Sequence, residues 1–233
     1  MEINIWSDVR CPFCYIGKRN FEKALEQFPQ KDELKVVWRS FELDPSLKTQ
    51  PETNTVDYFV QSKGISRQQA TQMLSHATNM AKEVGLNFDF DKAILANSFN
   101  AHRLIQMAKS KDLGDEIEEA LFKAHFADGV NIDDTESLIE IGVSIGMDSE
   151  EVRKAMESDA FDYEVRQDQL DARNIGVQGV PFFVFNNKYA VSGAQPPAAF
   201  LETIEKSFAE YKKDNPGLII SKGDSCSTDG TCD

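Results

Sequence analysis

Two cysteines separated by a proline and a phenylalanine, Cys11-Pro12-Phe13-Cys14, directly follow a short predicted strand at residues 3–7. The segment after them is predicted to be a helix that stops at Pro29, because its apolar residues recur at helical spacing. A β-branched and aromatic run at residues 34–41 reads as a second strand. The cysteine pair is therefore expected at the start of the helix in a strand–helix–strand unit.

A helix N-terminus offers unpaired N–H groups and a partial positive charge, which favour a thiolate, the reactive species in disulfide exchange. Pro12 suits the first helical position because its missing N–H costs nothing there. Cys14 would lie one turn further on the same side, with the two Cα atoms about 5–6 Å apart, a span that a disulfide bridges. We expect Cys11 to be an exposed nucleophile and Cys14 the more buried thiol that resolves mixed disulfides. Arg10 adjoins Cys11, and its positive charge would help to stabilise the thiolate if the side chain points toward the sulfur.

The chain has four cysteines in two close pairs, Cys11 with Cys14 and Cys226 with Cys232. In a reducing compartment, close pairs are more often redox-active or metal-binding than structural. A chance motif and half of a metal site are the alternatives for the first pair. A strand before the motif and an amphipathic helix after it favour redox chemistry.

The C-terminal half of the chain matches the N-terminal unit. Residues 180–185 read as a buried strand, Asn186-Asn187 as a turn, 188–192 as the return strand, and 197–212 as a final helix. Val180-Pro181 opens this strand, a place where proline is tolerated only at special positions. Its peptide bond is either trans at a sheet edge or cis.

Residues 55–175, between the two halves, are mostly predicted to be helical. Asp148 and Glu151 have the spacing of a helix cap and its partner. The run at 138–145 suits either a strand or a helix, and the acidic residues before it favour a helix. Residues 214–233 are rich in Gly, Ser, Asp and Thr and read as a flexible tail.

The formal net charge is −14, which argues against nucleic acid and anionic membrane surfaces as partners. The sequence contains no run of about 18 apolar residues, so no membrane span is predicted. The N-terminus lacks a basic segment followed by an apolar run, so no secretory signal is predicted and a cytoplasmic location is expected. No cofactor is predicted, and the oligomeric state is left open.

Four segments resemble the FrnE-type branch of the DsbA family of disulfide oxidoreductases, in the right order and across nearly the whole chain. They are residues 7–17 (SDVRCPFCYIG), 100–104 (NAHRL), 126–132 (FADGVNI) and 176–183 (GVQGVPFF).

This resemblance implies an α/β thioredoxin-like core, residues 1–54 and 176–213, with a helical insertion at 55–175 and a Cys-containing tail at 214–233. It implies Cys11 as nucleophile, Cys14 as resolving thiol and Pro181 as a cis proline facing them. Protein or peptide disulfides and thiols would be the substrates. Exported DsbA proteins carry Pro-His between the cysteines; Phe13 here removes one donor to the thiolate, so a reductase or isomerase role gains weight.

Two related branches share the architecture but use a serine at the position of the first cysteine. These are the kappa-class glutathione transferases and the 2-hydroxychromene-2-carboxylate isomerases. Cys11 argues against both, and a glutathione-dependent transferase or isomerase remains an alternative function. The glutathione-binding surface of these branches resembles the corresponding surface expected here, so glutathione is also a candidate substrate or redox partner.

Two further side chains are candidates for supporting roles. Asp8, after the first strand, is either a proton acceptor near Cys14 or a turn-forming acid. His102, in the Asn-Ala-His-Arg segment, either borders the active-site groove or is a packed residue. His76 and His125 read as structural.

Cys226 and Cys232 enclose five residues, one of them Gly230, and such a loop can close a disulfide. One hypothesis is a second redox pair that relays electrons to or from Cys11 and Cys14. The alternatives are a non-essential disulfide and a zinc site with four cysteine ligands, although this tail lacks the compact spacing that zinc sites usually have.

Overall fold

The computed structural model describes residues 1–216, and in it four strands form one mixed sheet in the order β2-β1-β3-β4. The central strand β1 (Glu2–Ser7) pairs in parallel with β2 (Lys35–Ser40) and antiparallel with β3 (Phe182–Phe185). β4 (Tyr189–Ser192) completes the sheet beside β3. Strands from the two ends of the chain therefore lie side by side, as predicted.

The first helix, α1 (Pro12–Gln27), starts where the sequence predicted, with Cys11 as the residue before it and Pro12 at the first helical position. Cys11 has an extended backbone, and its N–H donates to the carbonyl oxygen of Asp8, 2.9 Å away. A tight turn therefore carries the chain from β1 directly into α1. The short helix η1 (Lys31–Glu33) then leads to β2.

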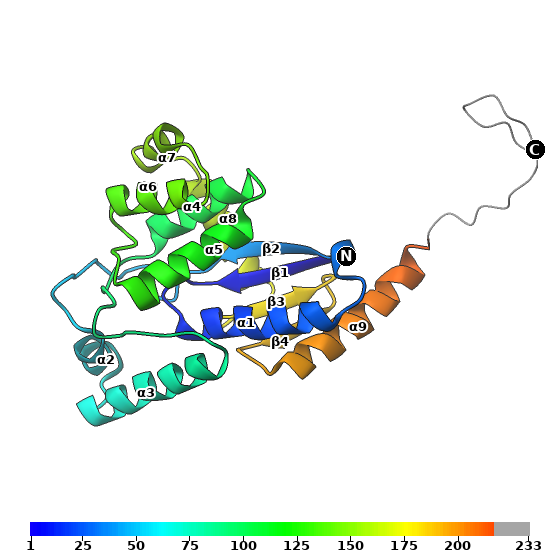
Figure 1. Cartoon of the computed structure of the whole chain (residues 1–233), viewed down its shortest axis with the longest axis horizontal. Helices are drawn as coiled ribbons and strands as arrows, with labels where there is room; N and C mark the ends of the chain where they lie inside the picture. The colour runs from blue at the N-terminus through cyan, green and yellow to red at the C-terminus, as the bar shows by residue number, and fades with distance from the viewer. Residues whose placement is uncertain (217–233) are drawn as a thin grey trace, which may run out of the picture.

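One face of the sheet is covered by α1 and by α9 (Pro197–Asp214), as Figure 1 shows. Side chains alternate between the two faces of a strand, so Ile3, Ile5, Phe183 and Phe185 all point to this side, where they are fully buried. The rings of Phe21 and Phe200 on the helices pack against them, among other side chains.

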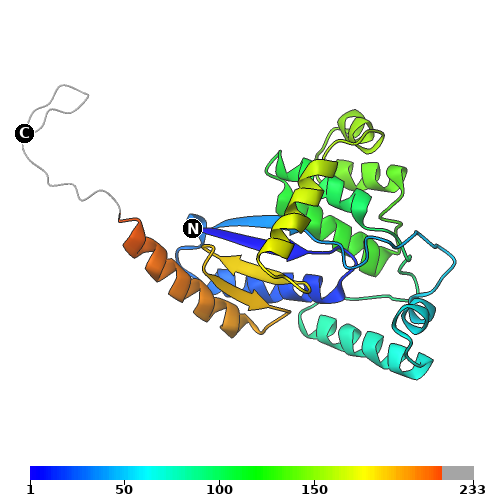
Figure 2. The same cartoon turned by 180° about the vertical axis from the view of Figure 1, so that it is seen from behind.

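The opposite face is covered by α8 (Asp162–Asn174), which crosses the sheet in Figure 2. Trp6 packs there with Ala172 and Val177, and its indole N–H donates to the carbonyl oxygen of Asp168, 2.9 Å away. The indole N–H is thereby satisfied although the ring is buried.

Helices fill the segment between the two halves of the core (Figure 1). They are α2 (Thr55–Lys63), α3 (Arg67–Glu83), α4 (Phe99–Lys109), α5 (Gly114–Lys123), the π-helical η2 (Ala124–Asp128), α6 (Thr135–Ser144), α7 (Ser149–Met156) and α8. The ambiguous run at 138–145 is helical, and Asp148 accepts a hydrogen bond from the N–H of Glu151 as the predicted cap of α7. The fold is thus a thioredoxin-like core with a helical insertion, while the boundaries at 54/55 and 175/176 stay predictions.

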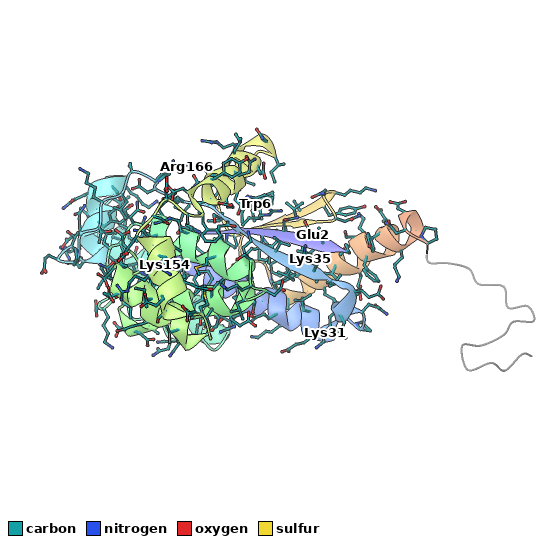
Figure 3. The ribbon with its side chains drawn as sticks, turned by 90° about the horizontal axis from the view of Figure 1, so that it is seen from above. Glu2, Trp6, Lys31, Lys35, Lys154 and Arg166 are labelled. Atoms are coloured by element: carbon teal, nitrogen blue, oxygen red, sulfur yellow. The ribbon has the colours of Figure 1, made fainter. Side chains whose placement is uncertain are left out.

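A buried lysine ties the core to this insertion. Lys18 on α1 is only 2% exposed, and its ammonium contacts the carboxylates of Glu22, Asp115 (3.0 Å) and Glu119 (3.4 Å). Two of these acids lie on α5, so the ion pairs connect α1 to the insertion. In contrast, Lys35 and Glu2 pair at 3.6 Å on the exposed outer end of the sheet (Figure 3).

The β3–β4 hairpin turns at Asn186 and Asn187, whose φ angles of 50° and 53° suit a tight two-residue turn. The sequence prediction started the third strand at Val180, which is wrong: β3 begins at Phe182. Proline has no N–H to give to a ladder, so regular pairing starts only after Pro181.

No helix within residues 1–216 has both the length and the hydropathy of a membrane span. The predicted tail pair, Cys226 and Cys232, lies outside the described residues.

Candidate active site

Cys11 and Cys14 are both free thiols at the N-terminus of α1. The N–H of Cys14 donates to the carbonyl oxygen of Cys11 at 3.0 Å, which holds the two residues in one turn. Cys14 is the more buried of the two, as predicted, with 1% of its surface exposed. The prediction that Cys11 is exposed is wrong, because only 4% of its surface is accessible.

The covering of Cys11 comes in part from the segment before β3. The Sγ atom of Cys11 lies 3.5 Å from the carbonyl oxygen of Val180, within hydrogen-bond distance for sulfur. The sequence could not predict this burial, since Cys11 and Val180 are 169 positions apart in the chain.

The Val180–Pro181 peptide bond is cis, so that expectation is confirmed. Pro181 also touches α1: a Cβ placed on Gly17 would come within 2.9 Å of its Cγ. The carbonyl oxygen of Pro181 accepts a hydrogen bond from the N–H of Gly193, 2.8 Å away. These contacts hold the Val180 carbonyl above the cysteine pair from two sides.

Burial raises the pKa of the Cys14 thiol well above its usual range, and the neighbouring Cys11 adds to the effect. Cys14 therefore holds its proton at neutral pH. Any reaction in which it attacks as a thiolate requires a nearby group to take that proton.

Asp8, at the end of β1, has a fully buried carboxylate. Its oxygens accept hydrogen bonds from the backbone N–H groups of Leu43 (2.8 Å) and Arg10 (3.1 Å). Burial opposes ionisation of Asp8, but His102, Arg10 and Leu43 together outweigh it and lower the pKa of this carboxyl. Asp8 is therefore charged at neutral pH.

His102, on α4, does not border an open groove, because it is fully buried. Its Nε2 lies 3.7 Å from an Asp8 oxygen, an ion-pair distance but longer than a hydrogen bond. Burial works against its charged form, yet the negative charge of Asp8 outweighs that and raises the pKa of His102. Both ring nitrogens lack a hydrogen-bond partner within the described residues.

Glu118 is a second buried carboxyl in this region, which sequence reasoning missed. It lies on α5, is 1% exposed, and its Oε2 has no hydrogen-bond partner among residues 1–216. Burial raises its pKa to about 8. In the sequence, the only signal for Glu118 is its position on the buried face of α5, whose other acids are exposed or half-buried.

The dipeptide between the cysteines faces outward. Phe13 is 36% exposed, one of few large apolar side chains on the described surface, and Pro12 is half-buried. An exposed aromatic ring beside a reactive thiol is a contact point for an apolar part of a substrate.

Two residues that the sequence left without a role also lie beside Pro12. Arg10 and His125 line the same small cavity as Pro12, although His125 was expected to be structural. His125 comes from η2, where α5 widens into a π-turn, and such turns are frequent at functional sites. That irregular turn leaves no periodic signal in the sequence.

The described residues contain no cluster of three or more His, Cys, Asp or Glu side chains that could hold a metal. A four-cysteine zinc site would need Cys226 and Cys232, which lie beyond the described part. The structure thus brings together Cys11, Cys14, Asp8, Val180 and Pro181, with His102 behind Asp8.

The chain as a whole is similar to a known family and to several known proteins. A family model described as a DSBA-like thioredoxin domain matches residues 2–205. The uncharacterized protein YwbO of Bacillus subtilis (strain 168) is 27% identical over 216 residues, covering 91% of this chain and 98% of that protein.

Among solved structures, the probable DsbA oxidoreductase SCO1869 from Streptomyces coelicolor is 35% identical, with a TM-score of 0.85 and coverage of 100% of this chain and 98% of that one. The cytosolic disulfide reductase DsbM from Pseudomonas aeruginosa with GSH is 16% identical, with a TM-score of 0.62 and coverage of 92% and 99%. At that identity the likeness to DsbM concerns the fold alone.

Proposed function

The chain belongs to the DSBA-like thioredoxin domain family, and from that premise we propose that it catalyses thiol–disulfide exchange on protein or peptide disulfides through Cys11 and Cys14. The observation that carries the proposal is the pair of free thiols at the start of α1, with the Cys11 sulfur 3.5 Å from the Val180 carbonyl oxygen.

In the reductive direction, the Cys11 thiolate attacks one sulfur of the substrate disulfide. A mixed disulfide forms, and the other substrate sulfur leaves as a thiolate. Cys14 then loses its proton and attacks the Cys11 sulfur, which releases the second substrate thiol. The substrate gains two electrons, and the protein becomes a Cys11–Cys14 disulfide; the reverse sequence oxidises a dithiol.

Asp8 is our candidate for the group that takes the Cys14 proton, because its backbone carbonyl oxygen accepts a hydrogen bond from the N–H of Cys11 at 2.9 Å. Its carboxylate is charged at neutral pH, where Cys14 still holds its proton. His102 is proposed as a positioning residue that keeps Asp8 charged across 3.7 Å. The backbone at Val180 and Pro181 is proposed to pair with the extended substrate chain, as its carbonyl already faces Cys11.

Glutathione is a proposed redox partner, supported by the GSH in the DsbM structure. A cytoplasmic location and membership of the FrnE-type branch are further proposals. The first is supported by the description of DsbM as cytosolic; the second is supported by the four segments identified in the sequence.

The deciding experiment is dithiol-dependent reduction of insulin, followed by turbidity. The wild-type protein is expected to accelerate it, and Cys11→Ser is expected to abolish the acceleration. Unchanged activity in Cys11→Ser would refute the proposal. Turnover of small electrophiles that survives loss of Cys14 would instead favour a glutathione-dependent transferase or isomerase.

Equilibration with glutathione would establish the direction of catalysis. A reduction potential of about −120 mV for the Cys11–Cys14 pair indicates an oxidant, and about −270 mV indicates a reductase. The tail pair is proposed as an electron relay, so replacing both Cys226 and Cys232 by serine is expected to slow turnover. An unchanged rate would show that the tail cysteines are dispensable.

A further inference from the structure

A cavity of about 60 Å³ lies beside Pro12, where the start of α1 meets the helical insertion. Its walls are mainly apolar and aromatic, and they include Phe59, Phe90 and Phe126. Two of its polar side chains are already bonded: the Tyr58 hydroxyl donates to Asp44 at 3.2 Å, and the Thr55 hydroxyl donates to the carbonyl oxygen of Phe90 at 3.4 Å. The remaining polar side chains are Arg10 and His125.

Arg10 has no ion pair and no side-chain hydrogen bond within residues 1–216. Its guanidinium lies over the ring of Tyr58, 5.7 Å from the centroid, and its buried NH1 nitrogen has no acceptor. The carboxylates of Asp8 and Asp44 act on it through their charge, but both already accept other hydrogen bonds. A buried cationic nitrogen without a partner is costly, and its presence points to a ligand.

His125 is the second unpartnered group in the cavity. It is 6% exposed, and its Nδ1 has no hydrogen-bond partner among the described residues. Burial, together with the charge of Arg10, lowers its pKa to about 4, so the ring is neutral at pH 7 and carries a single N–H. The cavity thus offers one fixed positive charge and one neutral donor within apolar walls.

We propose that this cavity binds a carboxylate of the thiol or disulfide substrate, held by the Arg10 guanidinium and His125 Nδ1, while the substrate sulfur reacts at Cys11. The inference rests on the proposed exchange function and names the class of substrate it prefers. The cavity, at about 60 Å³, exceeds the space that a single water molecule needs, which suits a small polar group such as a carboxylate. Arg10 and Pro12, the two neighbours of Cys11 in the chain, both line the cavity, so a carboxylate bound there would lie near the cysteine.

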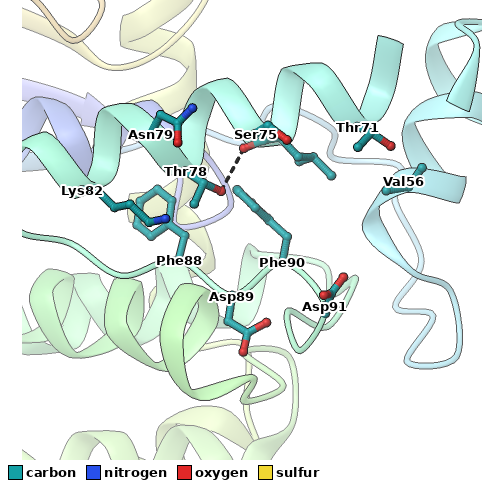
Figure 4. A pocket seen from close by; sticks show the side chains of 11 residues that line it. Val56, Thr71, Ser75, Thr78, Asn79, Lys82, Phe88, Asp89, Phe90 and Asp91 are labelled. Atoms are coloured by element: carbon teal, nitrogen blue, oxygen red, sulfur yellow. Dashed lines mark hydrogen bonds between the residues drawn. The ribbon is translucent and has the colours of Figure 1, made fainter. Parts of the chain in front are cut away.

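The rest of a larger substrate has room next to this site. Leu74 and Phe90 also line a wider cavity of about 380 Å³ between α3 and residues 88–91. Figure 4 shows Phe88 and Phe90 pointing toward α3, whereas Asp89 points away from it. The polar groups of Ser75, Asn79 and their neighbours on α3 line the other side.

The test compares two small disulfides of equal length, 3,3′-dithiodipropionate and its diamide, as oxidants of the reduced protein. Each rate constant is divided by that of the same disulfide with free dithiothreitol, which removes the intrinsic reactivity. We expect the corrected rate constant to be about tenfold or more higher for the dicarboxylate, because hydrogen bonds between charged groups are stronger than those to a neutral amide. Arg10→Gln is expected to bring this ratio close to one, with Arg10→Lys in between, and His125→Phe to reduce it.

Arg166→Gln is the matched control. Arg166 also lies over an aromatic ring, that of Phe99 at 5.2 Å, but it belongs to α8 (Figure 3) and does not line the cavity. The Arg166→Gln substitution removes the same charge, and it is expected to leave the ratio of the two corrected rate constants unchanged. Two pairs of cysteine peptides then identify the source of the preferred carboxylate by their rates. One pair ends in a carboxylate or an amide, and the other carries Asp or Asn beside the cysteine.

Equal corrected rates for the two disulfides in the wild-type protein would overturn the inference and leave the exchange function standing. A preference that persists in Arg10→Gln, or that Arg166→Gln lowers equally, would overturn it too, since the general field of the protein would then explain it. No reaction with either disulfide, in protein that reduces insulin, would also overturn the inference; only the additional loss of insulin reduction would overturn the exchange function itself. If thermal unfolding shows that Arg10→Gln is not folded, Arg10→Lys and His125→Phe decide.

Discussion

The sulfur of Cys11 lies 3.5 Å from the carbonyl oxygen of Val180, although 169 positions separate the two residues in the chain. This contact joins the start of α1 to the segment before β3. It also buries Cys11, so a substrate must reach the sulfur at a site already lined by Val180, Pro181 and Phe13. Selectivity is therefore expected to depend on these neighbours as well as on the two thiols.

Cys14→Ser is expected to stop the reaction at the mixed disulfide, because no second thiol can attack the Cys11 sulfur. After incubation with oxidised glutathione, with Cys226 and Cys232 also replaced by serine so that Cys11 is the only cysteine left, intact-protein mass spectrometry should detect one added glutathione. The Cys11→Ser variant is the control, and glutathione attached equally to it would contradict the separate roles of the two thiols.

Asp8→Asn is expected to slow release of the mixed disulfide about 100-fold near pH 7, the usual effect of losing a general base. The deficit should shrink at alkaline pH, where hydroxide removes the Cys14 proton. His102 holds the pKa of Asp8 down, so His102→Gln should move the acidic limb of the pH–rate profile to higher pH. Stopped-flow measurement of release from pH 5 to 9 checks both, and unaltered profiles would exclude the proton-acceptor role.

Glu118 is expected to make stability fall as pH rises. Its pKa of about 8 when folded exceeds the unfolded value near 4.5, so the folded state holds the extra proton between these values. This contribution is fully present at about pH 4 and lost above pH 8, an effect of up to about 5 kcal/mol. Urea unfolding at several pH values should show that Glu118→Gln loses this dependence, whereas Glu116→Gln, an exposed acid on the same helix, retains it. Identical curves for Glu118→Gln and the wild-type protein would contradict burial of an ionisable Glu118.

Lys18→Met is expected to destabilise the protein by about 3 kcal/mol, since the carboxylates on α1 and α5 lose their shared cation. Lys35→Met, which removes an exposed pair, should change the free energy of unfolding by less than about 1 kcal/mol. Chemical denaturation distinguishes the two. Equal losses would mean that the buried cluster does not bind the insertion to the core.

Gly17→Ala should disturb the site through Pro181, because the new methyl group would lie 2.9 Å from the proline ring. Overpacking of this kind costs about 1–3 kcal/mol, and a displaced Pro181 should lower insulin reduction. Gly179→Ala, where a Cβ meets no other atom within 4 Å, is the control. Full activity in Gly17→Ala would show that the Pro181 segment can shift without any effect on insulin reduction.

Periodicity and turn chemistry predicted most of the elements, because their signals are local. The helix start at Pro12, the asparagine turn and the cap at Asp148 each depend on residues a few positions apart. The predicted Pro181 cis bond came instead from a family resemblance.

The features that sequence reasoning missed depend on packing between distant segments. Cys11 is buried partly by Val180, and β3 starts late because Pro181 cannot pair. Glu118 and His125 become notable only when α5 and its π-turn pack beside the core. No spacing along the chain carries that information.

The order of the strands has a consequence for biosynthesis. β1, with Cys11 directly after it, is made first, yet its partner β3 lies about 180 residues later. A nascent chain therefore carries both thiols before the Val180 carbonyl that faces them exists. During translation the cysteine pair lacks its native surroundings, and its reactivity is under control of the fold only after the last strands have left the ribosome.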